Sequence, residues 1–322
     1  MENPIIDSDN EGFVQLPIDT NVIFSNPKNI YKQRIEKRQR KLLEKISFLQ
    51  PFLDEGEKIL LVTTGCSPVS AVEQMLTGAI LYILKRSLFV FTDKRIFHIP
   101  TRTNFSYRNS IAEIPYTACQ KVFMKGRTLV VEYKNKQKEK FVSIAGKERK
   151  KIQSILDTTS LEGRQSEAPQ RTYLCPRCTS RLIKEQYTCP NCALAFKSKV
   201  DGRKISIIYP GGGYFYTGHP FLGLGDALAE VYLSILVVIF LFGTISGVEG
   251  STIAFIIFGF ALALEKTITV YHSNHFIEEY IPKERNIKVN KVSSTPPETV
   301  KDFQSSEAEM ILTVRGDSAG SF

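Results

Sequence analysis

Two long apolar stretches without a charged residue lie in the C-terminal half of the chain, at 231–248 and 250–264. A helix needs about 20 mostly apolar residues to cross a bilayer, so this length predicts two crossings rather than one. Gly247 and Gly250, on either side of Val248 and Glu249, give the backbone the freedom that a tight reversal needs. The pattern predicts a transmembrane hairpin within 205–275, with helical spans at about 226–247 and 251–271.

Between residues 55 and 160 the pattern changes to short runs of β-branched and aromatic residues. Such runs predict strands at 59–63, 87–92, 95–99, 111–114, 119–124, 128–133 and 141–144. A helix is predicted at 147–156, where Ile152, Ile155 and Leu156 fall on one face. A further apolar stretch at 67–84 predicts a helix that packs on this domain or lies at the membrane interface.

Residues 89–98, Phe-Val-Phe-Thr-Asp-Lys-Arg-Ile-Phe-His, resemble the strand-turn-strand signature of the bacterial PH-like and GRAM-like families. The resemblance implies an antiparallel β-barrel at 55–160, closed by a C-terminal helix. It also implies a module that binds lipids or peptides and has no catalytic residues. The insertion at 67–84 departs from the family pattern. Together with the hairpin, this domain predicts a multidomain α+β membrane protein.

Four of the six cysteines form two Cys-Pro-x-Cys knuckles, and these are Cys175, Cys178, Cys189 and Cys192. Two thiolates at this spacing bind one metal ion, and two pairs complete the tetrahedral sulfur site that suits zinc. A closed site of four thiolates leaves no open position for chemistry, so we expect a structural Zn2+. Two disulfides are the alternative, which a reducing cytoplasm disfavours.

The knuckles resemble those of the small zinc-ribbon family, which usually has glycine where this chain has Thr179 and Ala193. The resemblance implies a ribbon at 173–200, with candidate strands at 181–183 and 186–188. Cys66 and Cys119 have no such partners and are predicted to be ordinary buried cysteines.

Ahead of the strands, residues 26–54 predict a helix that is basic on one side and apolar on the other, covering about 28–52. Its basic residues are Lys28, Lys32, Arg34, Lys37, Arg38, Arg40, Lys41 and Lys45. Such a helix can lie on anionic lipid headgroups, or it can dock on the domain with its charged side in solvent. The formal net charge of +9 fits an anionic membrane surface and also fits nucleic acid.

Lysines and arginines flank the hairpin on both sides, and its turn has none. The excess of positive charge on the flanks predicts that both termini and the folded domains are cytoplasmic, at the inner face of the plasma membrane. The acidic start of the chain lacks the pattern of a cleavable signal. Residues 1–25 and 286–322 have no apolar periodicity and are predicted to be disordered, and 161–172 is predicted to be a linker.

Ionisable residues gather near the cytoplasmic half of the predicted hairpin, namely His219, Asp226, Glu230, Glu265, His272 and His275. One interpretation is a metal, proton or acid/base site, because carboxylates inside a membrane are costly. The other places them in the wet interface, with Lys266 neutralising Glu265 and the histidines capping helix ends. The glycine-aromatic stretch at 209–223 resembles the entry of small two-helix transmembrane domains.

Taken together, these features predict a non-enzymatic, membrane-anchored adaptor that recognises lipid headgroups or a protein partner. A nucleic-acid-binding protein that uses the ribbon and the basic helix is one alternative. A small membrane enzyme, or an ion- or proton-handling protein, built on Asp226, Glu230, Glu265 and His272 is the other. It requires a homo-oligomer, because two helices are too few to enclose a path.

Overall fold

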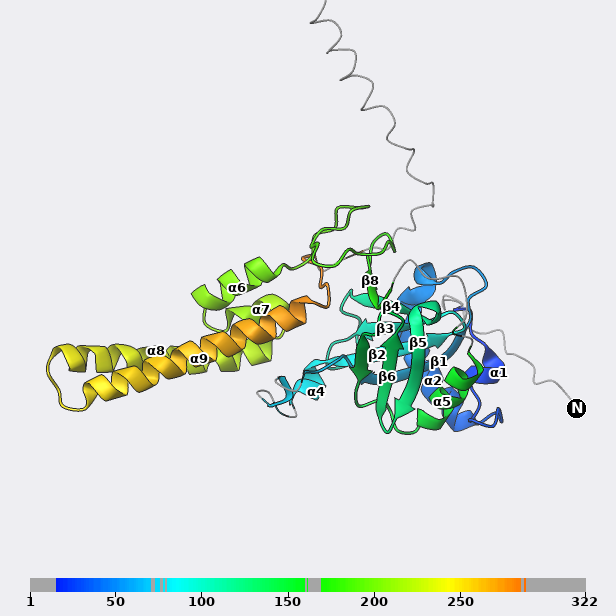
Figure 1. Cartoon of the computed structure of the whole chain (residues 1–322), viewed down its shortest axis with the longest axis horizontal. Helices are drawn as coiled ribbons and strands as arrows, with labels where there is room; N and C mark the ends of the chain where they lie inside the picture. The colour runs from blue at the N-terminus through cyan, green and yellow to red at the C-terminus, as the bar shows by residue number, and fades with distance from the viewer. Residues whose placement is uncertain are drawn as a thin grey trace, which may run out of the picture. The chain divides into compact units, whose positions relative to one another are not determined.

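The computed structural model describes residues 16–70, 73–75, 78, 80–159, 161, 169–284 and 287. Two antiparallel sheets form its N-terminal body (Figure 1). One has the strand order β1-β2-β3-β4-β8 and the other β5-β6-β7. The strands are β1 (Ile59–Cys66), β2 (Arg86–Thr92), β3 (Arg95–Pro100), β4 (Ile111–Pro115), β5 (Cys119–Lys125), β6 (Thr128–Tyr133), β7 (Lys138–Phe141) and β8 (Thr172–Leu174).

The predicted closed barrel is wrong, because the strands form two sheets. The short 3-10 helix η2 (Tyr116–Ala118) turns the chain out of the first sheet after β4, and β8 pairs with the edge of β4 that this leaves. An isolated bridge between Cys66 and Val142 links the end of β1 to the residue after β7. The last predicted strand, 141–144, is displaced, since β7 covers Lys138–Phe141.

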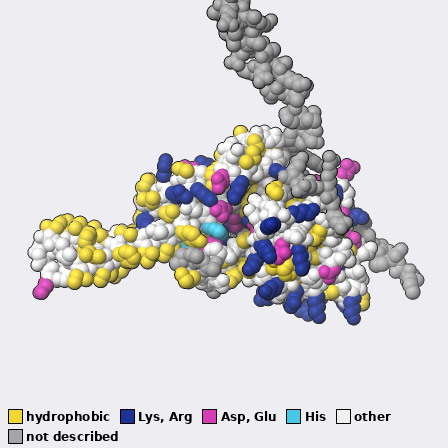
Figure 2. Space-filling model, viewed as in Figure 1, with side chains coloured by type: hydrophobic (Ala, Val, Ile, Leu, Met, Phe, Trp, Pro, Cys, Tyr) yellow, Lys and Arg dark blue, Asp and Glu magenta, His cyan; other side chains and the backbone are white. Residues whose placement is uncertain are grey.

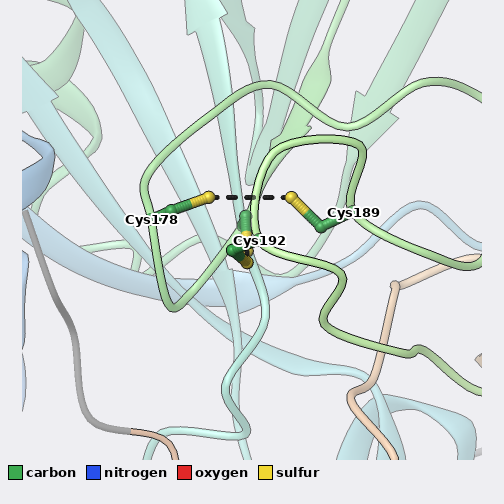
Figure 3. A group of neighbouring side chains, drawn as sticks. Cys178, Cys189 and Cys192 are labelled. Atoms are coloured by element: carbon green, nitrogen blue, oxygen red, sulfur yellow. Dashed lines mark hydrogen bonds between the residues drawn. The ribbon is translucent and has the colours of Figure 1, made fainter. Parts of the chain in front are cut away.

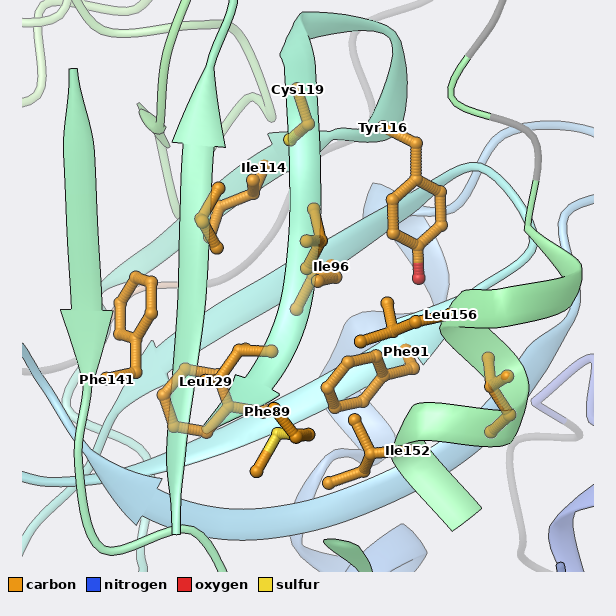
Figure 4. Close-up of a cluster of buried hydrophobic side chains, with 14 of the residues drawn as sticks. Phe89, Phe91, Ile96, Ile114, Tyr116, Cys119, Leu129, Phe141, Ile152 and Leu156 are labelled. Carbon is orange, nitrogen blue, oxygen red and sulfur yellow. The ribbon is translucent and has the colours of Figure 1, made fainter. Parts of the chain in front are cut away.

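Strand β2 supplies both hydrophobic cores of the body because its side chains alternate between the two faces of the sheet. Phe89 and Phe91 enter the core between the two sheets, which helix α5 (Arg149–Thr158) closes with Ile152 and Leu156 (Figure 4). Leu88 and Val90 enter a second core on the opposite face. Burial on both faces explains why β2 is a continuous apolar run.

The N-terminal helices cover this second core. They are α1 (Thr20–Ile23), α2 (Gln33–Lys45) and the 3-10 helix η1 (Ser47–Phe52). The single helix predicted at 28–52 is therefore two elements, and residues 28–32 precede the first of them. Disorder was predicted for 1–25, but Ile18 pairs with Ile59 and Ile23 is completely buried. Residues 1–15 lie outside the described residues, as do almost all of 286–322.

Two helices of the C-terminal half, α8 (Pro220–Ile245) and α9 (Ser251–Ile277), are long and apolar enough to cross a membrane. Only 6% of the most apolar window of each is buried within the protein. Figure 2 shows hydrophobic side chains along their surface. Both helices begin or end beyond the predicted spans of 226–247 and 251–271. The additional turns of α9 carry polar residues, and this helix packs against the neighbouring helices α6 (Lys199–Ile208) and α7 (Gly212–Thr217).

The insertion at 67–84 contains helical residues 73–75 and helix α4 (Ile80–Leu84), while residues 71, 72, 76, 77 and 79 lie outside the described residues. Its described part contacts the hairpin, because the hydroxyl groups of Ser70 and Tyr271 are 3.2 Å apart. In the ribbon, the predicted hairpin of 181–183 with 186–188 is wrong. Each knuckle instead has its own bridge, Leu174 with Arg181 and Thr188 with Ala195.

Candidate metal centre and polar cluster

The four knuckle cysteines bring their sulfur atoms together, within 4.8 Å of one another (Figure 3). Each close pair joins the two knuckles. The Sγ atoms of Cys175 and Cys192 are 3.5 Å apart, and those of Cys178 and Cys189 are 3.6 Å apart. A tetrahedron with Zn–S bonds of about 2.3 Å has sulfur–sulfur edges of about 3.8 Å, whereas a disulfide bond is about 2.05 Å. The arrangement therefore fits a shared metal ion and not two disulfides.

Both knuckles close through a residue with left-handed backbone conformation. Thr179 has φ 61° and Ala193 has φ 55°. Their N–H groups donate to the carbonyl oxygens of Cys175, at 2.9 Å, and Cys189, at 3.0 Å. Glycine adopts this conformation without strain, which explains why zinc ribbons usually have it at these two positions. A β-branched threonine at positive φ is strained, so the geometry of the first knuckle is imposed by its surroundings.

Hydrogen bonds favour the thiolate form that binds metals. Burial opposes ionisation of Cys189, but the Ser180 hydroxyl and the backbone amides of Cys192 and Asn191 donate to its sulfur and lower its pKa to about 7. The first knuckle has the same amide arrangement, since the N–H groups of Cys178 and Arg177 face the sulfur of Cys175. There, burial prevails and raises the pKa of the thiol. A bound cation would offset that cost.

The ribbon is fastened to the end of α9. The Tyr280 hydroxyl donates to the Ile183 carbonyl at 2.9 Å and accepts the Glu185 N–H at 2.8 Å. Backbone hydrogen bonds join Lys197 to Ile281 and Lys283 to Ala195. On its other side the ribbon meets β4, where Arg181 Nε lies 2.7 Å from the buried carboxylate of Glu113. The four-cysteine ribbon thus contacts both the sheet and the segment that follows α9.

A second group of ligand-type residues lies between α8 and α9. The carboxylates of Asp226, Glu230 and Glu265 offer oxygen atoms within 4.8 Å of one another. The Thr269 hydroxyl is 3.1 Å from both oxygens of Asp226 and 3.3 Å from Glu265. Lys266 pairs with Glu230 at 2.7 Å, and not with Glu265 as predicted. Oε1 of Glu230 and Oε2 of Glu265 are buried and have no hydrogen-bond partner among the described residues.

The predicted histidines do not join this carboxylate cluster. His272 Nδ1 lies 2.7 Å from the Tyr214 hydroxyl. His219 lies beside the ring of Phe276, with ring centroids 4.3 Å apart. Burial and the nearby Arg108 lower the pKa of His219 to about 3, so this imidazole is neutral. The six residues predicted as one polar site therefore belong to separate groups.

His275 belongs to a buried ion pair that sequence reasoning missed. Its Nε2 is 3.2 Å from Glu73, which pairs with Lys85 at 2.9 Å. Both side chains of the Glu73–Lys85 pair are almost completely buried. The available signal was Glu73 itself, because an acid inside an apolar stretch needs a partner. This contact fixes the described part of the insertion beside α9.

A chain of hydrogen bonds connects the sheet to the end of α9. Arg171 donates to His98 Nδ1 at 3.2 Å, so Nε2 carries the proton and faces the Ser67 oxygen at 3.0 Å. Ser67 in turn donates to Glu279 at 3.0 Å. Burial holds the pKa of His98 well below its usual range. His98, Ser67 and Glu279 are all buried within the protein, which suits a structural role better than a catalytic one.

A cleft of about 670 Å³ opens between β7, the ribbon and the end of α9. Its cationic side chains are largely paired. Arg171 is 2.8 Å from Glu139, Lys199 is 2.8 Å from Glu278, and Lys138 is 2.8 Å from Glu132. The cleft therefore has little uncompensated charge with which to attract an anion.

Comparison with known proteins adds no relative. No protein-family model, curated protein or solved structure matches the chain.

Proposed function

We propose that this chain is a membrane-anchored, non-enzymatic binding protein whose exposed basic surface recognises anionic lipid headgroups at the cytoplasmic face. The hairpin is the anchor, and the body presents the basic surface. Two sheets closed by α5 support a PH-like module, because strands followed by one C-terminal helix are the order of that fold. The positive flanks of the hairpin support the cytoplasmic orientation.

Helix α2 carries this proposal. Its apolar residues Leu42 and Leu43 pack against the core beneath the sheet. Gln39 is completely buried and bonds the backbone of Val62 through both ends of its amide, at 3.0 and 3.1 Å. The apolar side of α2 is therefore used in folding and is not available for insertion into a bilayer. What remains outside is its cationic side.

The cationic side is both dense and exposed. Seven side chains of the segment are exposed to solvent, and these are Lys28, Lys32, Arg34, Lys37, Arg40, Lys41 and Lys45. Arg38 is only partly exposed and pairs with Glu148, and exposed Arg40 pairs with Glu36 at 2.7 Å. Near an anionic membrane each lysine or arginine contributes about 1 kcal/mol. A few of them acting together are enough for headgroup binding that weakens as salt increases.

The four cysteines hold a structural zinc ion in this proposal. Zinc suits four thiolates in a tetrahedron, and a site closed by four protein ligands supports no chemistry. Its contribution is rigidity, because the ribbon contacts both Glu113 of the sheet and Tyr280 after α9.

Tethering of vesicles tests the headgroup proposal with the full chain. The protein is placed in nanodiscs of neutral lipid, and its capture of neutral or phosphatidylserine-containing vesicles is measured at low and high salt. We expect capture of the anionic vesicles only, lost at high salt. Replacing Lys32, Arg34, Lys37 and Lys41 by glutamine should weaken capture by up to about a thousandfold, given about 1 kcal/mol for each cation.

A matched control removes the same charge elsewhere in the body. Lys125, Lys134, Lys136 and Lys140 are exposed on the three-stranded sheet and its turns, and their replacement by glutamine should change capture much less. Equal loss in both variants would mean that net charge, and not the α2 surface, attracts the vesicles. Preference for DNA over anionic vesicles would instead favour nucleic acid as the ligand.

A further inference from the structure

Helices α6 and α7 form an elbow that exposes apolar side chains at its tip, with exposed Arg203 and Lys204 one turn before the tip. Val200, Ile207, Ile208 and Tyr209 are each at least 60% exposed, and Phe215 is 46% exposed. Such a cluster of exposed apolar side chains is unusual on a protein surface in water. Phe221, Leu224 and Leu228 of α8 continue this apolar surface along the chain and are 91%, 55% and 66% exposed.

The inner side of the elbow packs tightly on α9 because it carries small residues. A Cβ atom added to Gly213 would lie 2.1 Å from the Ser273 hydroxyl and 2.2 Å from that of Ser206. A Cβ atom added to Gly202 would lie 2.5 Å from Ile277. The elbow therefore lies directly against the hairpin, with room for glycine alone at these contacts.

Two hydrogen bonds give the depth of the elbow tip along the hairpin. Lys266 donates to the Ser206 carbonyl at 2.9 Å, and the Gly211 N–H donates to Glu230 at 3.2 Å. Lys266 and Glu230 both lie about 22 Å along the helix axis from the turn that joins α8 to α9. Exposed Glu249 in that turn suits the far headgroup layer.

The hydrocarbon layer of a bilayer is about 30 Å thick, which leaves the elbow tip roughly 8 Å below the near boundary. A tilt of the hairpin would only deepen it. Irregular backbone at this depth requires polar partners from the protein. Glu230 supplies one to Gly211 and Lys266 supplies one to Ser206, while Pro210 has no N–H to satisfy.

We propose that the elbow 199–217 is a re-entrant element, with Ile207, Ile208 and Tyr209 in contact with the acyl chains of the near leaflet. The Glu230–Lys266 pair anchors it by satisfying its backbone. This inference rests on the membrane anchorage proposed above, but it is independent of headgroup recognition by α2. In this proposal, Glu230 and Lys266 hold the elbow in position against the hairpin.

The absence of tryptophan from the chain makes a direct test available. Ile208→Trp and Tyr209→Trp each create a single fluorophore at the elbow tip, in the full chain reconstituted in vesicles. Phe242→Trp, on the exposed side of α8, is the control inside the membrane. Ile183→Trp, which is 51% exposed on the ribbon, is the control in water.

Lipids brominated at the middle of their acyl chains should quench both elbow tryptophans to within about twofold of the quenching at Phe242→Trp by bromines near the headgroup, because the elbow tip lies roughly 8 Å below the near boundary and Phe242 only about 4.5 Å from the turn at the far one. Both should emit at shorter wavelength than Ile183→Trp. Elbow tryptophans that behave like Ile183→Trp, while Phe242→Trp is quenched, would overturn the re-entrant elbow and leave the anchor intact. Loss of quenching at Phe242→Trp as well would overturn the anchor too.

Discussion

The sheet-bearing body and the helical hairpin arrange the same residue types in opposite ways. In the body, Phe89 is completely buried between the sheets, and many lysine and arginine side chains lie on the visible surface (Figure 2). In the hairpin, Phe242 is 64% exposed, whereas Thr269 and Glu230 are almost completely buried between helices. The contrast teaches that the two regions suit different solvents. The buried apolar core of the body is typical of a fold in water, and the exposed apolar surface of the hairpin suits acyl chains.

Loss of the proposed zinc ion should have the largest effect on this contrast, because the ribbon contacts both regions. Structural zinc contributes about 10–16 kcal/mol in small zinc domains. We expect Cys189→Ser to abolish zinc binding and to release the ribbon from Tyr280. Zinc content measured by mass spectrometry and limited proteolysis of the ribbon check both effects. Cys119→Ser is the matched control, since this buried cysteine lies in the sheet core.

Truncation of one phenylalanine in each region compares the two environments directly. Phe89→Ala should destabilise the body by about 4 kcal/mol, because it leaves a cavity in a packed core. Phe242→Ala should cost under about 1 kcal/mol, because lipid replaces the lost contacts. Denaturation midpoints of the chain in nanodiscs give both values. Similar losses in the two variants would mean that Phe242 is packed against protein.

Removal of one buried charge should destabilise the hairpin more than truncation of an exposed apolar side chain does. Glu230→Ala leaves Lys266 unpaired at membrane depth, and we expect a loss of about 3 kcal/mol. Combining Glu230→Ala with Lys266→Met removes both charges and should recover more than half of that loss. The thermal stability of the original protein, Glu230→Ala, Lys266→Met and the double variant, measured in nanodiscs, gives the interaction energy of the pair. No recovery in the double variant would contradict the pairing as the source of the stability.

Acid should weaken the body through a buried histidine. The folded pKa of His98 lies below the value of about 6.5 of the unfolded chain, so the unfolded state binds more protons as the pH falls. The stability from the neutral imidazole is fully present above pH 6.5 and is lost progressively as the pH falls below it. His98→Gln can keep both hydrogen bonds and should flatten this part of the pH profile. An unchanged profile would exclude His98 as its source.

A substitution in the carboxylate cluster should change the stability of the hairpin least. The sign of this change, with and without a divalent cation, shows whether the cluster holds a metal ion. Glu265→Gln removes one of three neighbouring carboxyl groups and should stabilise the hairpin by no more than about 1 kcal/mol in metal-free buffer. Stability of both forms is measured with and without millimolar Mg2+ or Mn2+. If a divalent cation stabilises the original protein and not the variant, then the cluster holds a metal ion.

Sequence patterns were sufficient where a feature depends on neighbouring residues. The uncharged runs predicted two helices long and apolar enough to cross a membrane, and the cysteine spacing predicted four sulfur atoms close enough to share a metal ion. The turn at Asp93 predicted the hairpin of β2 and β3. Each of these signals acts over a few residues and needs no knowledge of distant contacts.

Features that depend on distant partners escaped prediction. The pairing of Lys266 with Glu230 depends on how two helices are rotated about each other, which spacing along one helix does not reveal. The order of residues 16–25 depends on a bridge to Ile59. The first sheet gains its fifth strand because β8, after a long interval in sequence, pairs with the edge of β4.

Extraction of membranes that contain the full chain with alkaline carbonate tests the anchor most directly. Proteins held at the surface by charge are released by this treatment, whereas a hairpin whose apolar side chains face acyl chains is retained. We predict that the chain stays in the membrane pellet at high pH and at high salt. Its quantitative appearance in the soluble fraction, still intact, would contradict the membrane hairpin on which the proposed function rests.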